Sequence, residues 1–246
     1  MATRLTGVVI RASDVKSLSE FWTKVLGKDV VDGAYGVALR FDAASGPKTA
    51  RKNRVHLDLK GGPGQLERLL ELGAVRVDIG QGEVPWEVLA DPEGNEFCLQ
   101  PPTPVDELGA GSPGLVNGSL NGHRRGFGGL DGADAGIGVR WTAVCQDAAD
   151  PQAQSKFWGA ALGYGWQVVA EGDWGLALRQ ADDVRCPMLV LGPPVAEKDG
   201  PNRVYLRVTP NPGSHVVVET SRLVVEGARR QGELLTDPEG NEFHIA

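Results

Sequence analysis

The chain is poor in cysteine, with three in 246 residues. Cys98, Cys145 and Cys186 are widely spaced and form no Cys-X-X-Cys pair, which argues against a disulfide framework and against a structural zinc site. The sequence also lacks runs of lysine or arginine, and its formal net charge is −7. The electrostatic signature of a nucleic-acid-binding protein is therefore missing, and we expect a small molecule as the partner.

Long hydrophobic segments are absent as well. No stretch approaches the roughly 20 apolar residues that a membrane-spanning helix needs, and the first residues lack the apolar region of a signal peptide. We therefore expect a soluble, cytoplasmic protein without a membrane partner. Hydrophobic residues make up 41% of the chain, enough for the core of one large domain or of two ordinary ones.

An internal repeat decides between one domain and two. Four sequence blocks recur in the same order, separated by 136 to 149 residues. So long a period indicates domain duplication rather than a solenoid of short units. We predict domains at 1–100 and 137–246, joined by a flexible linker rich in glycine and proline at 101–136. The paired blocks are FWTKVLG (21–27) with FWGAALG (157–163), GVALR (36–40) with GLALR (175–179), NRVHLDL (53–59) with NRVYLRV (202–208), and DPEGNEF (91–97) with DPEGNEF (237–243).

The first block predicts a helix that lies on a sheet. Asp14 stands at the N-cap position and Gly27 supplies the stop. Between them, apolar residues follow the spacing of one helix face. Asp150, Pro151 and Gly163 repeat these signals in the second copy. The apolar face consists of Leu18, Phe21, Trp22, Val25 and Leu26.

The remaining pattern of each copy favours short strands around a second helix. The turn Asp91-Pro92-Glu93-Gly94 has the residues of a type I turn and leads into a strand at 95–100. In the second copy, Val216–Val218 and Val224–Val225 are β-branched and disfavour the matching second helix. For the first copy we predict strands around Val30–Val31, Val37–Phe41 and Arg54–Lys60, and a helix near Pro63–Leu72.

The sequence resembles the glyoxalase-like branch of the vicinal oxygen chelate superfamily, which also includes bleomycin resistance proteins and dioxygenases. The resemblance rests on a capped helix with FWxxxLG, a later NRVHLDL strand and a terminal DPEGNEF strand. The resemblance covers about 2–100 and 137–246. It implies an α+β fold in which each domain pairs two βαβββ modules into a curved mixed sheet, with helices on the convex side and a ligand or metal cup on the concave side. Because this scaffold serves lyases, dioxygenases, epimerases and drug-binding proteins, function has to be argued from the site.

Strand alternation identifies the side chains that would line each cup, because residues i and i+2 share a face. In the first copy these are His56, Asp58, Glu96 and Cys98, and in the second Tyr205, Arg207, Glu242 and His244. On the first strand of each copy the same reasoning places Leu5, Gly7 and Val9, and Trp141, Ala143 and Cys145, toward the cup.

One hypothesis is a divalent metal (Zn, Fe, Mn or Ni) held by His56 and Glu96, as in a metal-dependent lyase or ring-cleaving dioxygenase. Metal-using relatives take a further ligand from the first strand, where Gly7 and Ala143 cannot coordinate through a side chain. The first copy also lacks a strand where another carboxylate is usual. Two alternatives need no metal: acid–base catalysis by His56, Asp58 and Glu96, or mutual hydrogen bonding of these groups without a catalytic role.

The second cup offers a different chemical surface. Tyr205, Arg207, Glu242 and His244 suit an anionic or carbonyl-bearing ligand, with Arg207 as the fixed cation. Trp86, Trp141 and Trp174 are candidate aromatic walls for a planar ligand, whereas Trp22 and Trp158 lie on helix faces and are expected in the core.

The function expected from these features is binding of a small organic molecule in the cup of one or both domains. An enzyme using His56 and Glu96 and a resistance protein that sequesters a drug or metabolite are the alternatives. We also expect the two copies to pack against each other as a pseudo-dimer within a monomeric chain.

Overall fold

The structure is a computed structural model that describes residues 2–44, 46–80, 82–102, 138–163, 165–183 and 185–246. Within this part of the chain the strands form two mixed sheets, which we call sheet A and sheet B. The predicted linker at 101–136 lies almost entirely outside the described residues. None of the described helices is long and apolar enough to cross a bilayer.

Sheet A runs in the order β12-β13-β14-β11-β1-β2, and sheet B in the order β4-β5-β6-β3-β7-β10-β9-β8. The strands of sheet A are β1 (Thr3–Ala12), β2 (Ala38–Ala43), β11 (Val204–Pro210), β12 (Arg229–Gln231), β13 (Leu234–Thr236) and β14 (Glu242–Ile245). Those of sheet B are β3 (Val55–Lys60), β4 (Val75–Arg76), β5 (Glu87–Ala90), β6 (Glu96–Gln100), β7 (Arg140–Asp147), β8 (Trp166–Gly172), β9 (Gly175–Gln180) and β10 (Met188–Gly192). The helices are α1 (Val15–Leu26), α2 (Lys28–Asp32), α3 (Gln65–Glu71), α5 (Pro151–Leu162) and α6 (Val216–Val225).

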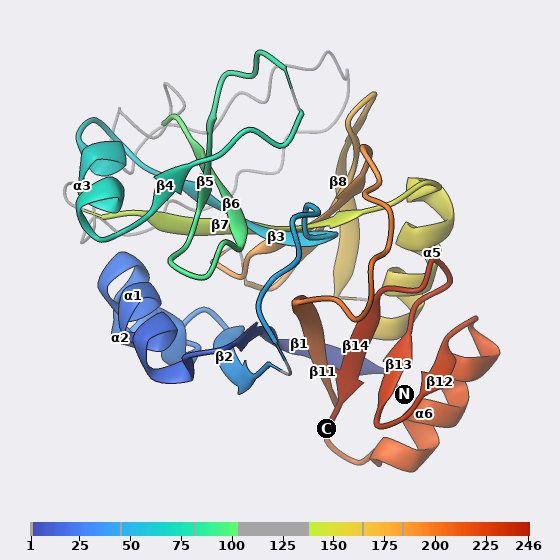
Figure 1. Ribbon diagram of the computed structural model, residues 1–246. Coiled ribbons are helices and arrows are strands. Elements are labelled where there is room, and N and C mark those ends of the chain that lie inside the picture. The colour runs from blue at the N-terminus through green and yellow to red at the C-terminus, as the bar shows by residue number, and fades with distance from the viewer. Residues whose placement is uncertain (1, 45, 81, 103–137, 164, 184) are drawn as a thin grey trace.

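Each sheet combines strands from both copies. β1 of the first copy pairs antiparallel with β11 of the second, with Val9 opposite Tyr205. Likewise β3 pairs antiparallel with β7, with His56 opposite Cys145. In Figure 1 the blue strand β1 from the chain start therefore lies beside β11, which comes from the last quarter of the chain. The expectation that each copy would close its own sheet is thus wrong, because one module of each copy completes the sheet of the other.

The copies differ most in their first modules. β2 pairs parallel with β1, and β10 pairs parallel with β7. β2 is therefore the spatial equivalent of β10, although its sequence block GVALR matches GLALR in β9. The second copy adds the β8–β9 hairpin, so sheet B extends beyond β10 whereas sheet A ends at β2. The first copy therefore has two strands fewer in this module, where the sequence predicted one missing strand, and the assumed equivalence of the two blocks is corrected.

Two predictions about valine-rich segments are changed by the structure. Val30 and Val31 lie in the short helix α2 rather than in a strand, and Gly33 ends this helix with φ 105°. The second helix of the second copy does form, as α6. Its Leu223 is fully buried while Val217 and Val225 are exposed. Tertiary packing of one helix face therefore outweighs the low helix propensity of valine.

Helices α1 and α5 fill the space between the two sheets. α1 packs on β1 and β2 of sheet A, and its Trp22 meets Phe97 of sheet B edge to face at 5.2 Å. In α5, Trp158 meets Phe243 of sheet A in the same way at 5.3 Å. The apolar face predicted for α1 is buried throughout. The core therefore covers one face of each sheet and leaves the other face free for polar side chains.

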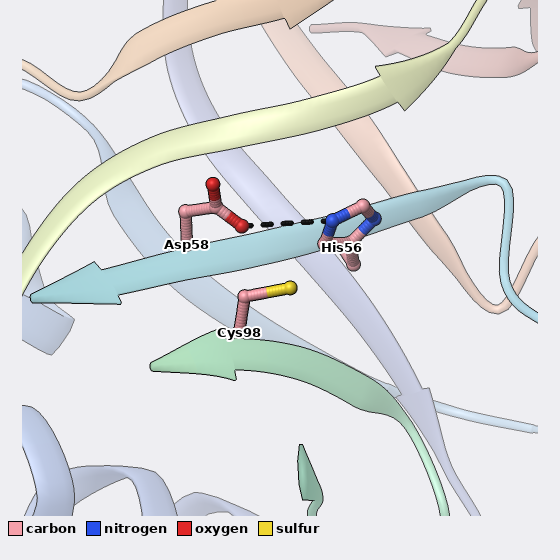
Figure 2. Close-up of side chains that lie close together, drawn as sticks. All are labelled: His56, Asp58 and Cys98. Carbon is pink, nitrogen blue, oxygen red and sulfur yellow. Dashed lines mark ion pairs between the residues drawn. The ribbon is translucent and has the colours of Figure 1, made fainter. Parts of the chain in front are cut away.

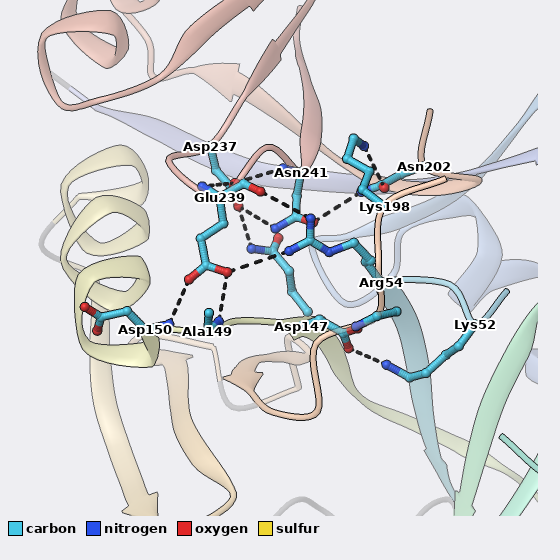
Figure 3. A network of polar contacts seen from close by, with 12 residues as sticks. Lys52, Arg54, Asp147, Ala149, Asp150, Lys198, Asn202, Asp237, Glu239 and Asn241 are labelled. Atoms are coloured by element: carbon cyan, nitrogen blue, oxygen red, sulfur yellow. Dashed lines mark hydrogen bonds and ion pairs between the residues drawn. The ribbon is translucent and has the colours of Figure 1, made fainter. Parts of the chain in front are cut away.

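A pseudo-symmetric set of polar contacts joins the copies, and Figure 3 shows the half of it around Arg54 and Glu239. Arg54 of the first copy donates to the backbone oxygen of Glu239 at 3.2 Å and lies 3.7 Å from its carboxylate. Arg203 of the second copy donates to the carboxylate of Glu93 at 2.7 Å. Each glutamate comes from a DPEG turn and also accepts two backbone N–H bonds just before the first helix of its own copy. These donors are Ser13 and Asp14 for Glu93, and Ala149 and Asp150 for Glu239.

Candidate functional site

The strand β3 separates polar from apolar side chains as its alternation predicts. Val55, Leu57 and Leu59 are buried in the core. His56 and Asp58 lie on the opposite face, with side-chain exposures of 16% and 14%. We call this surface of sheet B face B. The period of two in an extended chain is sufficient to place both groups there.

Cys98 completes a cluster on face B. The neighbouring strand β6 runs parallel to β3 and places Cys98 opposite Asp58. The His56 Nε2 and Asp58 Oδ1 atoms are 3.5 Å apart. One ligand atom from each of His56, Asp58 and Cys98 lies within 4.8 Å of the other two. Figure 2 shows the three side chains converging from the two strands.

Two polar atoms of this cluster have unmet hydrogen-bonding capacity. Asp58 Oδ2 accepts a bond from Gln100 Nε2 at 3.1 Å, but Asp58 Oδ1 and His56 Nδ1 are buried without a hydrogen-bond partner among the described residues. Leaving such an atom unsatisfied costs about 1–3 kcal/mol. The cluster therefore contains buried polar atoms that its own residues do not satisfy, and such atoms are expected where a protein binds a ligand or metal.

Burial controls the protonation of the cluster. Desolvation lowers the pKa of His56, and the nearby Asp58 charge opposes this effect only in part. Burial also raises the pKa of the Cys98 thiol, and the negative charge of Asp58 adds to the rise. Cys145 on β7 is affected in the same direction by the same two causes. At neutral pH the imidazole is thus uncharged and both thiols keep their protons.

Glu96, the other predicted metal ligand, has a different partner. Its Oε1 accepts a bond from Lys48 Nζ at 2.7 Å, and its Oε2 accepts one from the Asn53 backbone at 3.1 Å. The side chains of Lys48 and Glu96 are both only 8% exposed. Glu96 is not one of the residues whose ligand atoms converge with His56. A buried, paired carboxylate of this kind neutralises its lysine and supports the strand end.

The corresponding surface of sheet A, which we call face A, carries other side chains in the same register. Arg207 on β11 lies opposite His244 on β14, as Asp58 lies opposite Cys98. Tyr205 donates through its hydroxyl to Asp42 at 2.8 Å. The guanidinium of Arg11 stacks over the Tyr205 ring at 5.0 Å.

Glu242 on face A repeats the contacts of Glu96. Both of its oxygens accept bonds from Lys198 at 2.8 Å, and one also accepts the Asn202 backbone N–H at 3.1 Å. The lysine–glutamate pair is therefore common to both halves, whereas the other polar residues of the two faces differ.

Comparison with protein-family models matches a glyoxalase-like domain to residues 7–100 and again to 143–246. The chain belongs to the glyoxalase-like domain family. Glyoxalase I from Zea mays has a similar fold, with a TM-score of 0.55 at 15% identity, over 99% of this chain and 92% of that one. A candidate dioxygenase from Bacillus subtilis subsp. subtilis str. 168 gives a TM-score of 0.53 at 13% identity, over 100% and 85% of the two chains. No protein of curated function matches the sequence.

The residues of this glyoxalase-like protein fit a divalent metal on face B. Imidazole nitrogen, carboxylate oxygen and thiolate sulfur are the donors that zinc takes in proteins. His56 Nε2 lies 3.5 Å from Asp58 Oδ1, and neither that oxygen nor His56 Nδ1 has a hydrogen-bond partner among the described residues. Three protein ligands leave a coordination position open for another molecule. The identity of the metal does not follow from these donors, since imidazole and carboxylate also suit iron, manganese and nickel.

A β-bulge changes the position of one predicted aromatic wall. The register between β3 and β7 shifts after the pair Asp58–Ala143, so that Leu59 lies opposite Trp141 and Thr142 is the extra residue. A bulge reverses which face the following side chains take. Trp141 is therefore buried in the core at 1% exposure. An equivalent shift in β1 turns Leu5 into the core, although alternation alone placed it on the opposite face.

The other two tryptophans predicted as aromatic walls, Trp86 and Trp174, lie away from the centre of face B. Trp86 is partly buried one residue before β5, in which Val88 lies opposite Cys98. Trp174 is 47% exposed in the turn between β8 and β9.

Several polar residues of the two faces were missed by the sequence analysis. Lys48 and Lys198 precede the NRV blocks by five and four residues, which marks them as similar positions of the repeat but does not reveal their glutamate partners. Gln100 lies two residues beyond Cys98 and shares its face by alternation. Arg179, which contacts Met188 Sδ at 3.2 Å, could not be placed on face B before the β9–β10 pairing was known.

Proposed function

We propose that this chain binds a small organic molecule on face B through a divalent metal held by His56, Asp58 and Cys98. The observation that supports this proposal is the convergence of three different donor atoms, two of them on residues with buried, unsatisfied polar atoms. This ligand set replaces the pair of His56 and Glu96 considered from the sequence. The carboxylate of Glu96 is already paired with Lys48. Its negative charge is therefore balanced without a metal.

Each residue of the set has a distinct part. Burial lowers the pKa of His56, so the imidazole is neutral and one of its nitrogens can bind a metal without first losing a proton. Asp58 supplies the negative charge, and Gln100 holds the carboxylate by its other oxygen. Cys98 has to give up its proton to bind, which makes the affinity for metal increase with pH. A bound divalent ion would act as a Lewis acid toward an oxygen atom of the ligand.

Other residues of face B suit the rest of a small molecule. Val88 lies opposite Cys98 and offers an apolar surface. Met188 lies opposite Ala143, and Arg179 contacts its sulfur while the buried Arg179 Nε has no partner among the described residues. A ligand with an apolar body and an acidic or carbonyl group would therefore find matching partners on both copies.

The metal is tested by titrating the chelator-treated full chain with Zn²⁺ and with Co²⁺. Calorimetry should show one tight site, and the cobalt form should show the charge-transfer absorption of a thiolate ligand. Loss of a ligand should weaken zinc binding by more than the roughly 10–100-fold expected for residues that only orient ligands. We therefore expect a loss of this size in His56→Gln and in Cys98→Ser.

Cys145→Ser is the matched control. Cys145 also places a thiol on face B, opposite His56, but it is not one of the three residues whose ligand atoms converge. The variant should bind zinc like the unmodified chain. Equal zinc affinity in Cys98→Ser and the unmodified chain, or no thiolate absorption with cobalt, would contradict the proposal.

Binding of an organic molecule is tested with catechol, a probe with two neighbouring oxygen atoms. It should bind to the zinc-loaded chain and lose most of its affinity in His56→Gln. Chemical analysis of catechol recovered from the Fe²⁺-loaded chain in the presence of O2 then separates two of the alternatives raised by the sequence: ring-cleaved catechol indicates a dioxygenase, and unchanged catechol is expected of a binding protein.

A further inference from the structure

Face A gathers positive charge around a residue without a side chain. Gly7 on β1 lies opposite Arg207 on β11 and opposite Ala38 on β2. A Cβ atom built at Gly7 would be 3.6 Å from Arg207 Cβ and 3.7 Å from Arg40 Cγ. The two arginine side chains therefore flank the same gap from neighbouring strands. His244 borders it on the far side of β11, opposite Arg207.

The carboxylates near this cluster already have partners or lie at its margin. Asp42 accepts a bond from Tyr205, and Glu242 is held by Lys198. Glu233 is an exposed residue in the turn between β12 and β13. Neither Arg40 nor Arg207 forms an ion pair with any described carboxylate. Face A is thus locally positive on a chain whose formal net charge is −7.

Two arginines on neighbouring strands, without a described carboxylate partner, favour the binding of an anion. Like charges that converge on one spot repel each other, and a stable surface usually intersperses both signs. Guanidinium groups present several N–H donors in a planar fork that matches carboxylate and phosphate oxygens. Gly7 leaves the space between the stems of the two arginines open, and a Cβ atom there would also lie 3.2 Å from the Ala38 backbone oxygen.

We propose that face A is a second, metal-independent site that binds a small molecule through its carboxylate or phosphate group, with Arg40 and Arg207 as the charged contacts and Gly7 as the open position between them. His244 lies next to Arg207 and supplies a further nitrogen for an oxyanion. This site is separate from the proposed metal cluster, because it uses strands of the other sheet.

The test is calorimetric titration of the full chain with inorganic phosphate and, separately, with succinate, at low ionic strength. Both probes carry the proposed oxyanion, and the comparison shows which of the two groups is preferred. Saturable binding of either probe is expected. Because a charge-assisted hydrogen bond contributes about 1.5–3 kcal/mol, Arg40→Gln and Arg207→Gln should each weaken binding by roughly 10-fold or more.

Arg230→Gln is the matched control. Arg230 lies on β12 of the same sheet and opposite Leu235, a core residue, so it belongs to the other face. The Arg230→Gln substitution removes the same charge and should leave the affinity for phosphate and succinate unchanged. His56→Gln should also leave it unchanged, which separates this site from the one on face B.

Three results would overturn the proposal: no saturable binding of either probe, equal weakening in Arg207→Gln and Arg230→Gln, or full affinity in the Arg40→Gln/Arg207→Gln double variant. Circular dichroism and thermal unfolding of each variant establish that the fold is retained. Should Arg207→Gln fail to fold, Arg40→Gln alone decides, because Arg40 is exposed at a strand near the sheet edge.

Discussion

Face B and face A occupy matching positions of a duplicated scaffold and share one polar element. In both, a lysine from the preceding loop binds the glutamate at the start of the last strand. Everything beyond that pair differs: Asp58 lies opposite Cys98 on one face, and Arg207 lies opposite His244 on the other. The comparison teaches that the shared pair supports the fold, while the residues that differ are those on which the two proposed binding sites depend.

The largest expected effect tests the shared pair. Lys48→Met leaves Glu96 buried without its cation, and breaking a buried ion pair in this way costs about 3–5 kcal/mol of unfolding free energy. Lys198→Met should cost less, because the Lys198 side chain is 30% exposed and water can replace it. Urea unfolding of both variants measures the difference.

The double variant Lys48→Met/Glu96→Met is the control for this prediction. It removes both charges and should recover most of the lost stability, since an apolar pair can replace a buried ion pair. If zinc binding also survives in the double variant, Glu96 is not a metal ligand. A double variant as unstable as Lys48→Met would show that the lysine acts through something other than its charge.

An intermediate effect is expected at the contacts between the copies. Arg203 donates at 2.7 Å to both Glu93 and the Gly46 backbone, whereas Arg54 approaches the Glu239 carboxylate only to 3.7 Å. Arg203→Met should therefore destabilise the chain by about 1.5–3 kcal/mol, the usual range for hydrogen bonds to charged groups.

Arg54→Met should cost clearly less in the same urea titration. This ordering follows only from contact length, since the two arginines are equivalent in the repeat. Equal losses in the two variants would show that the difference in these distances has no energetic weight.

The smallest expected effect concerns pH. Burial lowers the pKa of His244 below its ordinary value of 6.5, and the charge of Arg207 lowers it further, while Asp42 and Glu233 act in the opposite direction. Below about pH 6.5 the unfolded chain therefore binds this proton more readily than the folded chain, and stability falls as the pH falls. His244→Gln should lose less stability than the unmodified chain between pH 7 and pH 5.

Arg207→Gln should lie between these two, because it removes only the second cause of the lowered pKa. Urea midpoints measured across this pH range provide the comparison. Identical slopes for all three proteins would contradict this account of His244.

The alternation of polar and apolar residues along single strands predicted which side chains share a face of the site. The alternation of β3 was enough to place His56 and Asp58 on one face, and that of β6 placed Cys98 beside them. The bulge at Thr142 was not predictable, because one extra residue is invisible in the sequence yet turns Trp141 into the core.

Long-range partners were beyond sequence reasoning for a different physical reason. Both copies carry nearly the same blocks, so nothing in β1 distinguishes the second module of its own copy from that of the other. The pairing of β1 with β11 is settled by packing of the whole chain. Lys48 likewise reaches Glu96 across 48 residues, a separation at which spacing carries no geometric information.

The exchange of strands also determines what each half can do alone. If the halves were separated, β1 and β3 in one fragment and β7 and β11 in the other would lose a hydrogen-bonded neighbour and become open edges. Each fragment supplies strands to a sheet that it shares with the other. A mutation in β7 of the second copy therefore changes the surroundings of His56 in the first copy. Divergence after the duplication could therefore specialise either binding surface only within a single, undivided gene product.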